Sequence, residues 1–163
     1  MIRKAKKEDM VAISEIYNHY VETSIATFDT KPSPPQKFIL KYANILEHNL
    51  PWLVAEHFGE VVGYCYATPW KERPAYQYSV EISVYVAPQA ARQGWASKLY
   101  HELFEQLSDT SIHAVMAGIS LPNDASVRLH EGFGMSKVAH FEQVGFKFSE
   151  WVDVGYWQKI LPQ

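Results

Sequence analysis

The residues that follow a strand-like run ending at Val86 are of the types that could hold a phosphate. They read "PQAARQGWASKLY" (residues 88–100) and place Arg92 close to a single glycine, Gly94. Where such a stretch opens a helix, free backbone N–H groups and the helix dipole attract an anion. The three glycines of a dinucleotide-binding fingerprint and the Gly-Lys-Ser/Thr of a P-loop are both absent. The stretch is therefore either a phosphate site built from main-chain donors or a plain strand-to-helix turn with a surface arginine.

Other residue types that often do chemistry give little signal here. Cys65, the one cysteine, lies inside a strand-like run, which favours a small buried side chain over a nucleophile. No Gly-x-Ser-x-Gly element is present, which argues against a serine hydrolase. The sequence also predicts no bound metal, because most of the histidines show no pairing with metal-ligand spacing: His19, His48, His57, His101, His113 and His140.

The pattern of apolar residues predicts the elements that must position these groups. Their order is strand, two helices, three strands, helix, strand, helix and two strands, which indicates one domain over residues 1–163. A strand–helix–strand–helix unit in the middle favours an α/β (α+β) fold with a mixed sheet. The second helix should bury Phe38, Tyr42, Ile45 and Leu46. The predicted bounds are 2–5, 6–23, 36–48, 52–57, 61–68, 78–86, 94–107, 112–119, 124–131, and a strand pair within 137–160 that turns around 145–150.

Composition excludes several classes of partner. Of the 163 residues, 47% are hydrophobic and 20% are charged, as expected for a packed globular protein. The net charge is −3 and no long Lys/Arg run occurs, so we expect no binding to nucleic acid or to an anionic membrane. No segment approaches the roughly 18 apolar residues of a membrane helix, and no signal peptide is evident. With its lone cysteine, the protein is expected to be soluble and cytoplasmic.

The stretch "VYVAPQAARQGWASKLYHELF" resembles the acetyl-CoA loop of the GNAT superfamily of N-acetyltransferases. There, Gln/Arg-x-x-Gly-x-Gly/Ala begins a helix after a long strand; here residues 91–96 match, except that Ala91 stands where Gln or Arg is usual. The resemblance implies the GNAT fold, a mixed and mostly antiparallel sheet flanked by helices, with acetyl-CoA as cosubstrate. Longer stretches between Ile13 and Gln158 resemble the phosphinothricin acetyltransferases, a GNAT subfamily: "NHYVETSIATFDTKP", "PWLVAEHFGEVVGY", "PWKERPAYQYSVEISVYV", "LPNDASVRLHEGFGM" and "VGFKFSEWVDVGYWQ".

The resemblance implies direct transfer of an acetyl group from acetyl-CoA to a primary amine, without an acyl-enzyme. An α-amino group with a pKa near ~8 is mostly protonated at pH 7, so a general base is useful. Glu81, on the polar face of the long strand, matches the glutamate assigned as base in this subfamily; on its own it reads as a surface glutamate. His130 stands where many GNAT proteins have a general-acid tyrosine, and is either that acid or a packed helix histidine.

The resemblance also implies binding residues. Asn123 either caps the helix that follows it or contacts the cofactor, and it could do both. The charged loop that contains Lys71 and Arg73 is either beside the acceptor carboxylate or simply solvated. For acetyl-CoA, the implied contacts are Val84, Tyr85, Val86, Arg92, Gln93, Gly94, Trp95, Ala96, Ser97 and Asn123; for the acceptor they are Phe28, Lys71, Glu72, Arg73, Glu81, Ile82 and Ser83.

The acceptor that this resemblance implies is a small amino acid or analogue, of the phosphinothricin, methionine sulfoximine or methionine sulfone type. The subfamily is commonly dimeric, so a homodimer is expected. Two alternatives stay open. The chain could acetylate peptide N-termini or polyamines, which Glu47, Glu56 and Glu72 slightly favour. It could also be a CoA-binding module without catalysis, for which the unusual Ala91 is the one support.

Overall fold

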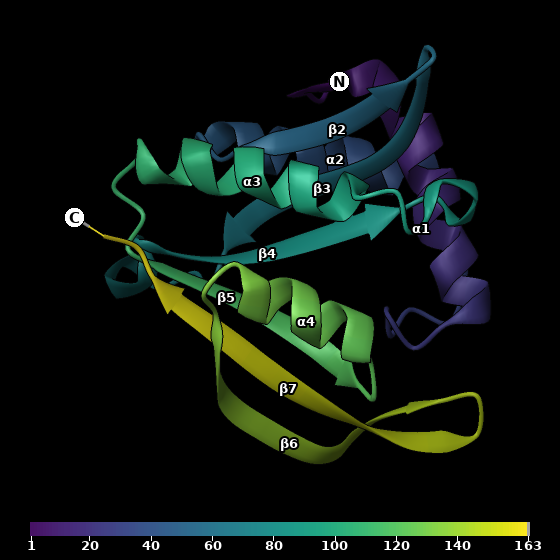
Figure 1. Ribbon diagram of the computed structural model, residues 1–163, viewed down its shortest axis with the longest axis vertical. Helices are drawn as coiled ribbons and strands as arrows, with labels where there is room; N and C mark the ends of the chain where they lie inside the picture. Colours follow the sequence, from purple (N-terminus) through teal and green to yellow (C-terminus); the bar gives the residue numbers. More distant parts are fainter. Residues whose placement is uncertain (163) are drawn as a thin grey trace.

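The computed structural model describes residues 1–162 and is organised around one twisted sheet (Figure 1). The spatial order of the strands is β1-β2-β3-β4-β5-β7-β6, and every neighbouring pair is antiparallel except β4 and β5. The mixed, mostly antiparallel sheet is therefore as predicted. The strands are β1 (Ile2–Lys4), β2 (Trp52–His57), β3 (Glu60–Pro69), β4 (Ser79–Val86), β5 (Ala114–Leu121), β6 (Ser136–Lys147) and β7 (Glu150–Ile160).

Four α-helices flank the sheet: α1 (Met10–Thr23), α2 (Pro35–Glu47), α3 (Trp95–Ser108) and α4 (Asp124–Gly132). In Figure 1, α3 and α4 cover the near face, while α1 and α2 lie behind the sheet and pack on each other. Three of the helices begin at a recognisable signal. Pro35 opens α2, where a missing N–H costs nothing. Gly94, in a left-handed conformation, precedes α3, and the Asn123 side chain accepts a hydrogen bond from the Ser126 N–H at the start of α4.

The parallel pair β4 and β5 is the feature of the sheet that bears on function. Only Ser79, Val80 and Glu81 pair with β5, through Ala114, Val115 and Met116. Beyond Glu81, β4 continues to Val86 in register with β3, so it diverges from β5 while its other edge stays hydrogen-bonded. The sheet therefore opens from residue 82 onward, and backbone groups on that edge of β4 have no strand partner. The β3–β4 register has no shift, so the opening arises from divergence and not from a bulge in that pair.

The core confirms most of the amphipathic patterns and corrects one. Phe38 and Ile45 of α2 are buried and Tyr42 is half-buried, but Leu46 is 54% exposed, because it lies at the edge of the helix face. Cys65 is fully buried, as expected.

Element ends shift by a few residues from prediction. The helix expected from residue 6 opens as a 3-10 turn, Lys7–Asp9. The strand pair turns at Phe148 and Ser149, both at positive φ, which lies within the predicted range of 145–150. Within residues 1–162, no helix is long and apolar enough to cross a membrane.

Candidate active site

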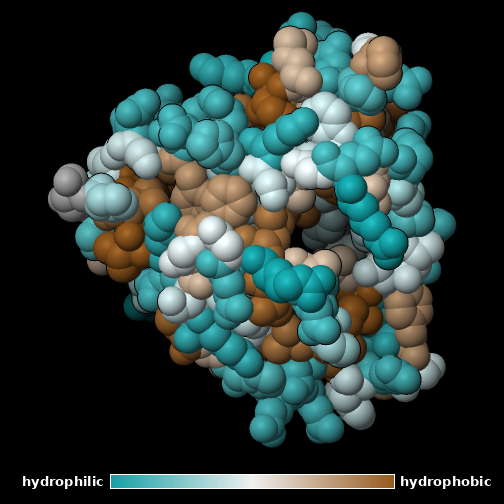
Figure 2. All heavy atoms as spheres, in the orientation of Figure 1, coloured by the Kyte–Doolittle hydropathy of each residue, from teal (hydrophilic) through white to brown (hydrophobic). Residues whose placement is uncertain are grey.

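A cavity of about 660 Å³ opens where β4 and β5 part. Its walls are the free end of β4, the C-terminal half of β5, the N-terminus of α3 and one face of α4. Figure 2 shows the surface hollowed between α3 and α4. Most of the residues implied as cofactor contacts line this cavity: Val84, Tyr85, Val86, Arg92, Gly94, Trp95, Ala96, Ser97 and Asn123.

The loop that opens α3 has the backbone geometry of an anion cradle. Arg92 and Gly94 both have positive φ, at 62° and 83°, and turns of this kind can direct successive N–H groups toward one anion. A Cβ at Gly94 would meet nothing within 4 Å, so the glycine is explained by its φ and not by crowding from the protein. Ala96 and Ser97 line the cavity in the first turn of α3. Gln93 is exposed and does not line the cavity, so of the implied cofactor contacts it alone falls outside.

His130 of α4 lies in the same cavity and is almost fully buried, at 4% exposure. Its Nδ1 is 2.7 Å from the carbonyl oxygen of Ser126, which can only accept, so Nδ1 carries the proton. Its Nε2 is 2.9 Å from the hydroxyl of Tyr100, which donates to it in the neutral imidazole. Burial lowers the pKa of His130, partly offset by the hydrogen bond to Ser126. The imidazole is therefore neutral and fixed in one tautomer.

A second cavity, of about 520 Å³, adjoins the first at Ala26, Ser83, Tyr85, Gly118 and Ser120, which line both. Glu81 lies in this second cavity with Phe28. Burial raises the pKa of Glu81, while Lys41 and Lys71 lower it and offset part of the rise. No hydrogen bond to the Glu81 carboxylate is found within the described part of the chain. Glu81 is thus a partly desolvated carboxylate in the smaller cavity, which adjoins the larger one, and it has free capacity to accept a proton.

The charged loop before β4 is less tightly placed than the resemblance implies. Lys71, Glu72 and Arg73 are all exposed and line neither cavity. Lys71 is near enough to Glu81 to lower its pKa, and its ammonium lies 5.1 Å from the centre of the Trp70 ring. Ile82 and Ser83 line the larger cavity, and Ser83 also lines the smaller one. The sequence-derived set therefore falls into one compact group and a peripheral charged loop.

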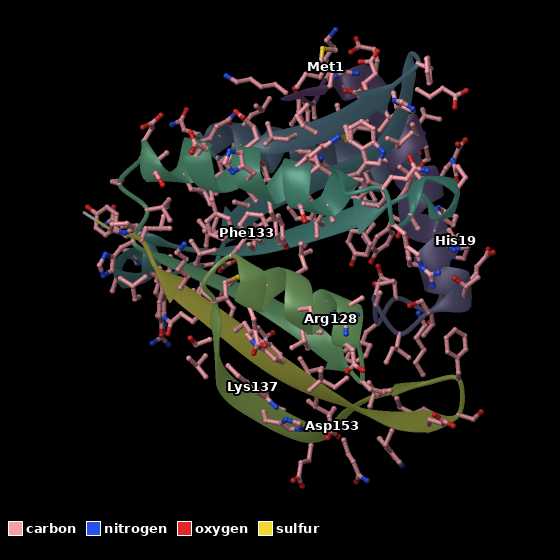
Figure 3. All side chains as sticks on the ribbon, in the orientation of Figure 1. Met1, His19, Arg128, Phe133, Lys137 and Asp153 are labelled. Carbon is pink, nitrogen blue, oxygen red and sulfur yellow. The ribbon has the colours of Figure 1, made fainter. Side chains whose placement is uncertain are left out.

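Three residues that sequence reasoning missed belong to this site. Tyr100 contacts His130 and lines the large cavity from α3, and Arg128 of α4, labelled in Figure 3, lines the same cavity. Lys41 of α2 reaches the hydroxyl of Tyr66 at 3.0 Å and acts on Glu81. Tyr100 sits at a buried position of the α3 pattern, where it reads as core. Arg128 and Lys41 come from two helices whose sequence spacing gives no sign that one lines the larger cavity and the other acts on Glu81.

Among residues 1–162, no three His, Cys, Asp or Glu side chains are grouped as metal ligands would be. The two cavities instead suit an organic ligand with an anionic end. The main-chain cradle and Arg92 would receive a phosphate, the channel along β4 would hold an extended chain, and Glu81 lies beyond the channel with its carboxylate free.

Comparison with known proteins agrees with this geometry. The family described as acetyltransferase (GNAT) matches residues 13–135. A phosphinothricin N-acetyltransferase from Streptomyces viridochromogenes is 44% identical over 158 residues, which cover 97% of this chain and 86% of that protein. An L-methionine sulfoximine/L-methionine sulfone acetyltransferase from Salmonella typhimurium is 36% identical over 162 residues, covering 99% and 95%.

Two solved structures have nearly the same fold. A ribosomal-protein-alanine N-acetyltransferase from Brucella melitensis superposes with a TM-score of 0.95 at 35% identity, covering 99% of each chain. A phosphinothricin acetyltransferase from Sinorhizobium meliloti, solved in complex with acetyl-CoA, superposes with a TM-score of 0.95 at 30% identity, covering 99% of this chain and 88% of that one.

Proposed function

This chain belongs to the GNAT family of N-acetyltransferases, and from that premise we propose that it acetylates the free amine of a small amino acid or amino-acid analogue. The observation that carries the proposal is the position of Glu81, a partly buried carboxylate in a small cavity that adjoins the cofactor-sized one. The similarity to phosphinothricin and methionine sulfoximine acetyltransferases supports acceptors of that type.

Acetyl-CoA is proposed to lie along the free edge of β4. Its pyrophosphate would bind the N–H groups of residues 92–97, with Arg92 and Arg128 as nearby cations. The pantetheine arm would follow Val84–Val86, as a further strand pairs with a sheet edge. Backbone N–H groups of residues 82–86 that point away from β3 would then face the thioester oxygen and stabilise the oxyanion. Asn123 caps α4 and lines the cavity, so both of its expected roles fit its position.

Glu81 is proposed as the general base, directly or through one water. It takes a proton from the ammonium form of the acceptor, and the amine lone pair attacks the thioester carbon. Glu81 releases its proton to solvent and then takes the second amine proton from the tetrahedral intermediate, the C–S bond breaks, and the CoA thiolate leaves. The raised pKa of Glu81 brings it closer to that of the amine, which eases the proton transfer.

The thiolate needs a proton, and His130 is proposed to supply it through Tyr100. His130 first gains a proton from solvent at Nε2. The Tyr100 hydroxyl then gives its own proton to sulfur while the Nε2 proton moves to the tyrosine oxygen. Both residues return to the states they have in this structure, so protons balance. Because burial lowers the pKa of His130, its protonated form is scarce but a strong donor.

Recognition of an acceptor carboxylate is proposed to come from the cations around the smaller cavity. Lys41 and Lys71 both act on Glu81, from α2 and from the loop before β4. Arg73 and Glu72 lie on the same exposed loop and would need that loop to fold toward the ligand. Phe28 and Ser83 line the cavity itself, which suits the aliphatic part of a small amino acid.

A homodimer is proposed, with the β6–β7 hairpin as its contact surface. The hairpin forms one edge of the sheet and exposes large apolar side chains, which is unusual for a monomer's surface. Trp151 is 64% exposed and its ring packs 4.8 Å from that of Phe146. The exposed set is Val138, Phe141, Val144, Phe146, Phe148 and Trp151.

A peptide N-terminus is the second candidate acceptor, favoured by the similarity to a ribosomal-protein-alanine N-acetyltransferase. One experiment separates the proposals. Release of free CoA thiol is measured with acetyl-CoA and a panel that contains phosphinothricin, methionine sulfoximine, methionine sulfone, the common amino acids, polyamines and short peptides. Turnover of free amino acids or analogues supports the first proposal, and turnover of peptides alone selects the second. CoA binding without turnover of any amine would leave a binding module.

A further inference from the structure

A lysine at the end of β6 anchors the loop of residues 24–28, which lines the smaller cavity. Lys147 is 4% exposed. Its ammonium donates to the carbonyl oxygens of Ser24 at 2.6 Å and Thr27 at 2.7 Å, and lies 3.5 Å from that of Tyr20. All three acceptors belong to the last turn of α1 or to the loop that follows it. The contact therefore joins segments more than a hundred residues apart.

The surroundings of Lys147 are built for a cation. A buried ammonium is costly unless its donors are satisfied, and here main-chain carbonyls satisfy them. The C-terminus of α1 carries the negative end of a helix dipole, which favours a positive charge at Tyr20 and Ser24. No carboxylate within residues 1–162 forms an ion pair with Lys147, although Asp29 acts on it at longer range. Its partner is thus the backbone of the loop, and the lysine fixes where that backbone lies.

The same loop delivers two side chains to the smaller cavity. Ala26 and Phe28 both line it, on either side of Thr27, whose carbonyl Lys147 holds. The Phe28 ring lies directly on the backbone of Gly145, where an added Cβ would come within 2.4 Å of the ring. Gly145 and Lys147 are two residues apart on β6, so this strand contacts the loop of residues 24–28 at two points.

The hairpin contributes its own wall to this cavity, through Phe141 and Val144. Lys147 therefore locks together two walls that come from opposite ends of the chain. We propose that Lys147 is a positioning residue that sets the distance between the loop of residues 24–28 and the β6–β7 hairpin, and thereby determines acceptor binding. The inference rests on the proposed function for its kinetic consequence, but its structural consequence is independent of any activity.

The first test replaces Lys147 with methionine, which keeps most of the length of the side chain and removes its hydrogen-bond donors. Loss of hydrogen bonds from a charged group is expected to raise the KM for the amine about tenfold. The KM for acetyl-CoA should change by less than about twofold, because no cofactor contact is touched. Lys137→Met, at an exposed lysine of the same strand (Figure 3), is the matched control and should leave both KM values unchanged. Unchanged amine KM in Lys147→Met, or an equal rise in both KM values, overturns the proposal.

A second pair of variants tests the contact between Gly145 and the Phe28 ring, and it does not depend on the folding of Lys147→Met. Gly145→Ala should displace the Phe28 ring and raise the amine KM selectively. In a Phe28→Ala background the same change should have little further effect, because the ring it displaces is gone. Gly132→Ala, whose added Cβ meets nothing within 4 Å, is the control. Additive effects of Gly145→Ala and Phe28→Ala would contradict the inference.

Amide hydrogen exchange of the free protein separates this inference from the proposed function. The N–H groups of Ala26 and Asp29 are hydrogen-bonded within the loop, to Ser24 and Thr27 side chains. In Lys147→Met they should exchange faster than in the unmodified protein, while amides of β4 should not. This holds even if no amine is ever acetylated, in which case the proposed function fails and the positioning role stands. Equal exchange in the two proteins overturns the positioning role whatever the kinetics show.

Discussion

The hydroxyl of Tyr100 lies 2.9 Å from Nε2 of His130, and this contact leaves neither ring nitrogen of the histidine free. His130 therefore does not face the reacting sulfur with an open donor of its own. Tyr100 also lines the cavity, so the proposed route of a proton from Nε2 of His130 to the leaving thiolate runs through its hydroxyl.

Tyr100→Phe should lower kcat by about ten- to a hundredfold, in keeping with loss of one positioned proton donor. The KM for acetyl-CoA should change little, because the ring and its packing remain. The variant should also lose about 1–3 kcal/mol of stability, since Nε2 of a buried histidine is left unpaired. Stopped assays of thiol release and urea unfolding measure the two effects. Tyr64→Phe is the control: its hydroxyl is buried without a partner in the described chain, so its removal should be neutral or stabilising. An unaffected kcat in Tyr100→Phe would remove it from the proton path.

Glu81→Gln should lower kcat/KM by about 10²–10⁴ at neutral pH, with partial recovery at high pH as the amine loses its own proton. In the unmodified enzyme the acid limb of the pH profile should lie above the usual range of a glutamate, because burial raises the pKa of Glu81. The variant should lack that limb. The exposed Glu105→Gln on α3 serves as the charge-matched control. A loss of equal size at every pH would mean that Glu81 acts structurally.

The sequence predicts features that depend on neighbouring residues better than features that depend on residues far apart in the chain. The positive-φ turn at Gly94 and the cap at Asn123 are local features, so a short window of residues suffices to predict them. The opening between β4 and β5 involves pairing partners far apart in sequence, and strict alternation along β4 gave no sign of it. Tyr100 looked like core because burial and function coincide there. Nothing in the sequence singles out Lys147, because its partners are main-chain carbonyls at the other end of the chain.

The stability of the protein should depend on the protonation of His130. Burial holds its pKa below 6.5 in the folded state, so between that lowered value and 6.5 the unfolded chain binds more protons. The free energy of unfolding should therefore contain a contribution that is complete above about pH 6.5 and is lost as the pH falls through the folded-state pKa. His130→Asn should flatten this part of the profile, measured by urea unfolding at a series of pH values. The exposed His101→Asn should leave it as in the parent protein. Parallel profiles for His130→Asn and the parent would contradict the assignment.

Trp151→Glu should weaken the proposed dimer. A large exposed aromatic at the centre of an interface is often worth 2 kcal/mol or more, so the dissociation constant should rise by about thirtyfold or more. Sedimentation equilibrium over a range of concentrations measures it. Phe58→Glu is the matched control, because Phe58 is 93% exposed on the β2–β3 turn and lies apart from the hairpin. If both variants dissociate equally, or the parent protein sediments as a monomer, the hairpin is not the interface.

Gly94→Ala should weaken binding of CoA while sparing the acceptor cavity. The added methyl meets no protein atom, so any effect must come from the backbone, which has a φ of 83° that alanine adopts at a cost of about 1 kcal/mol or more. Relaxation of the loop would turn its N–H groups away from the pyrophosphate, and the dissociation constant of CoA should rise by about tenfold, as measured by calorimetry.

Ala91→Gln tests whether a side chain at the same site can add to CoA binding. Ala91 lies before the two positive-φ residues, so Gln there can add a donor without disturbing the cradle and should tighten binding. If Ala91→Gln changes nothing while Gly94→Ala weakens binding, main-chain donors alone hold the phosphate. If Gly94→Ala binds CoA as the parent does, the cradle is not the phosphate site.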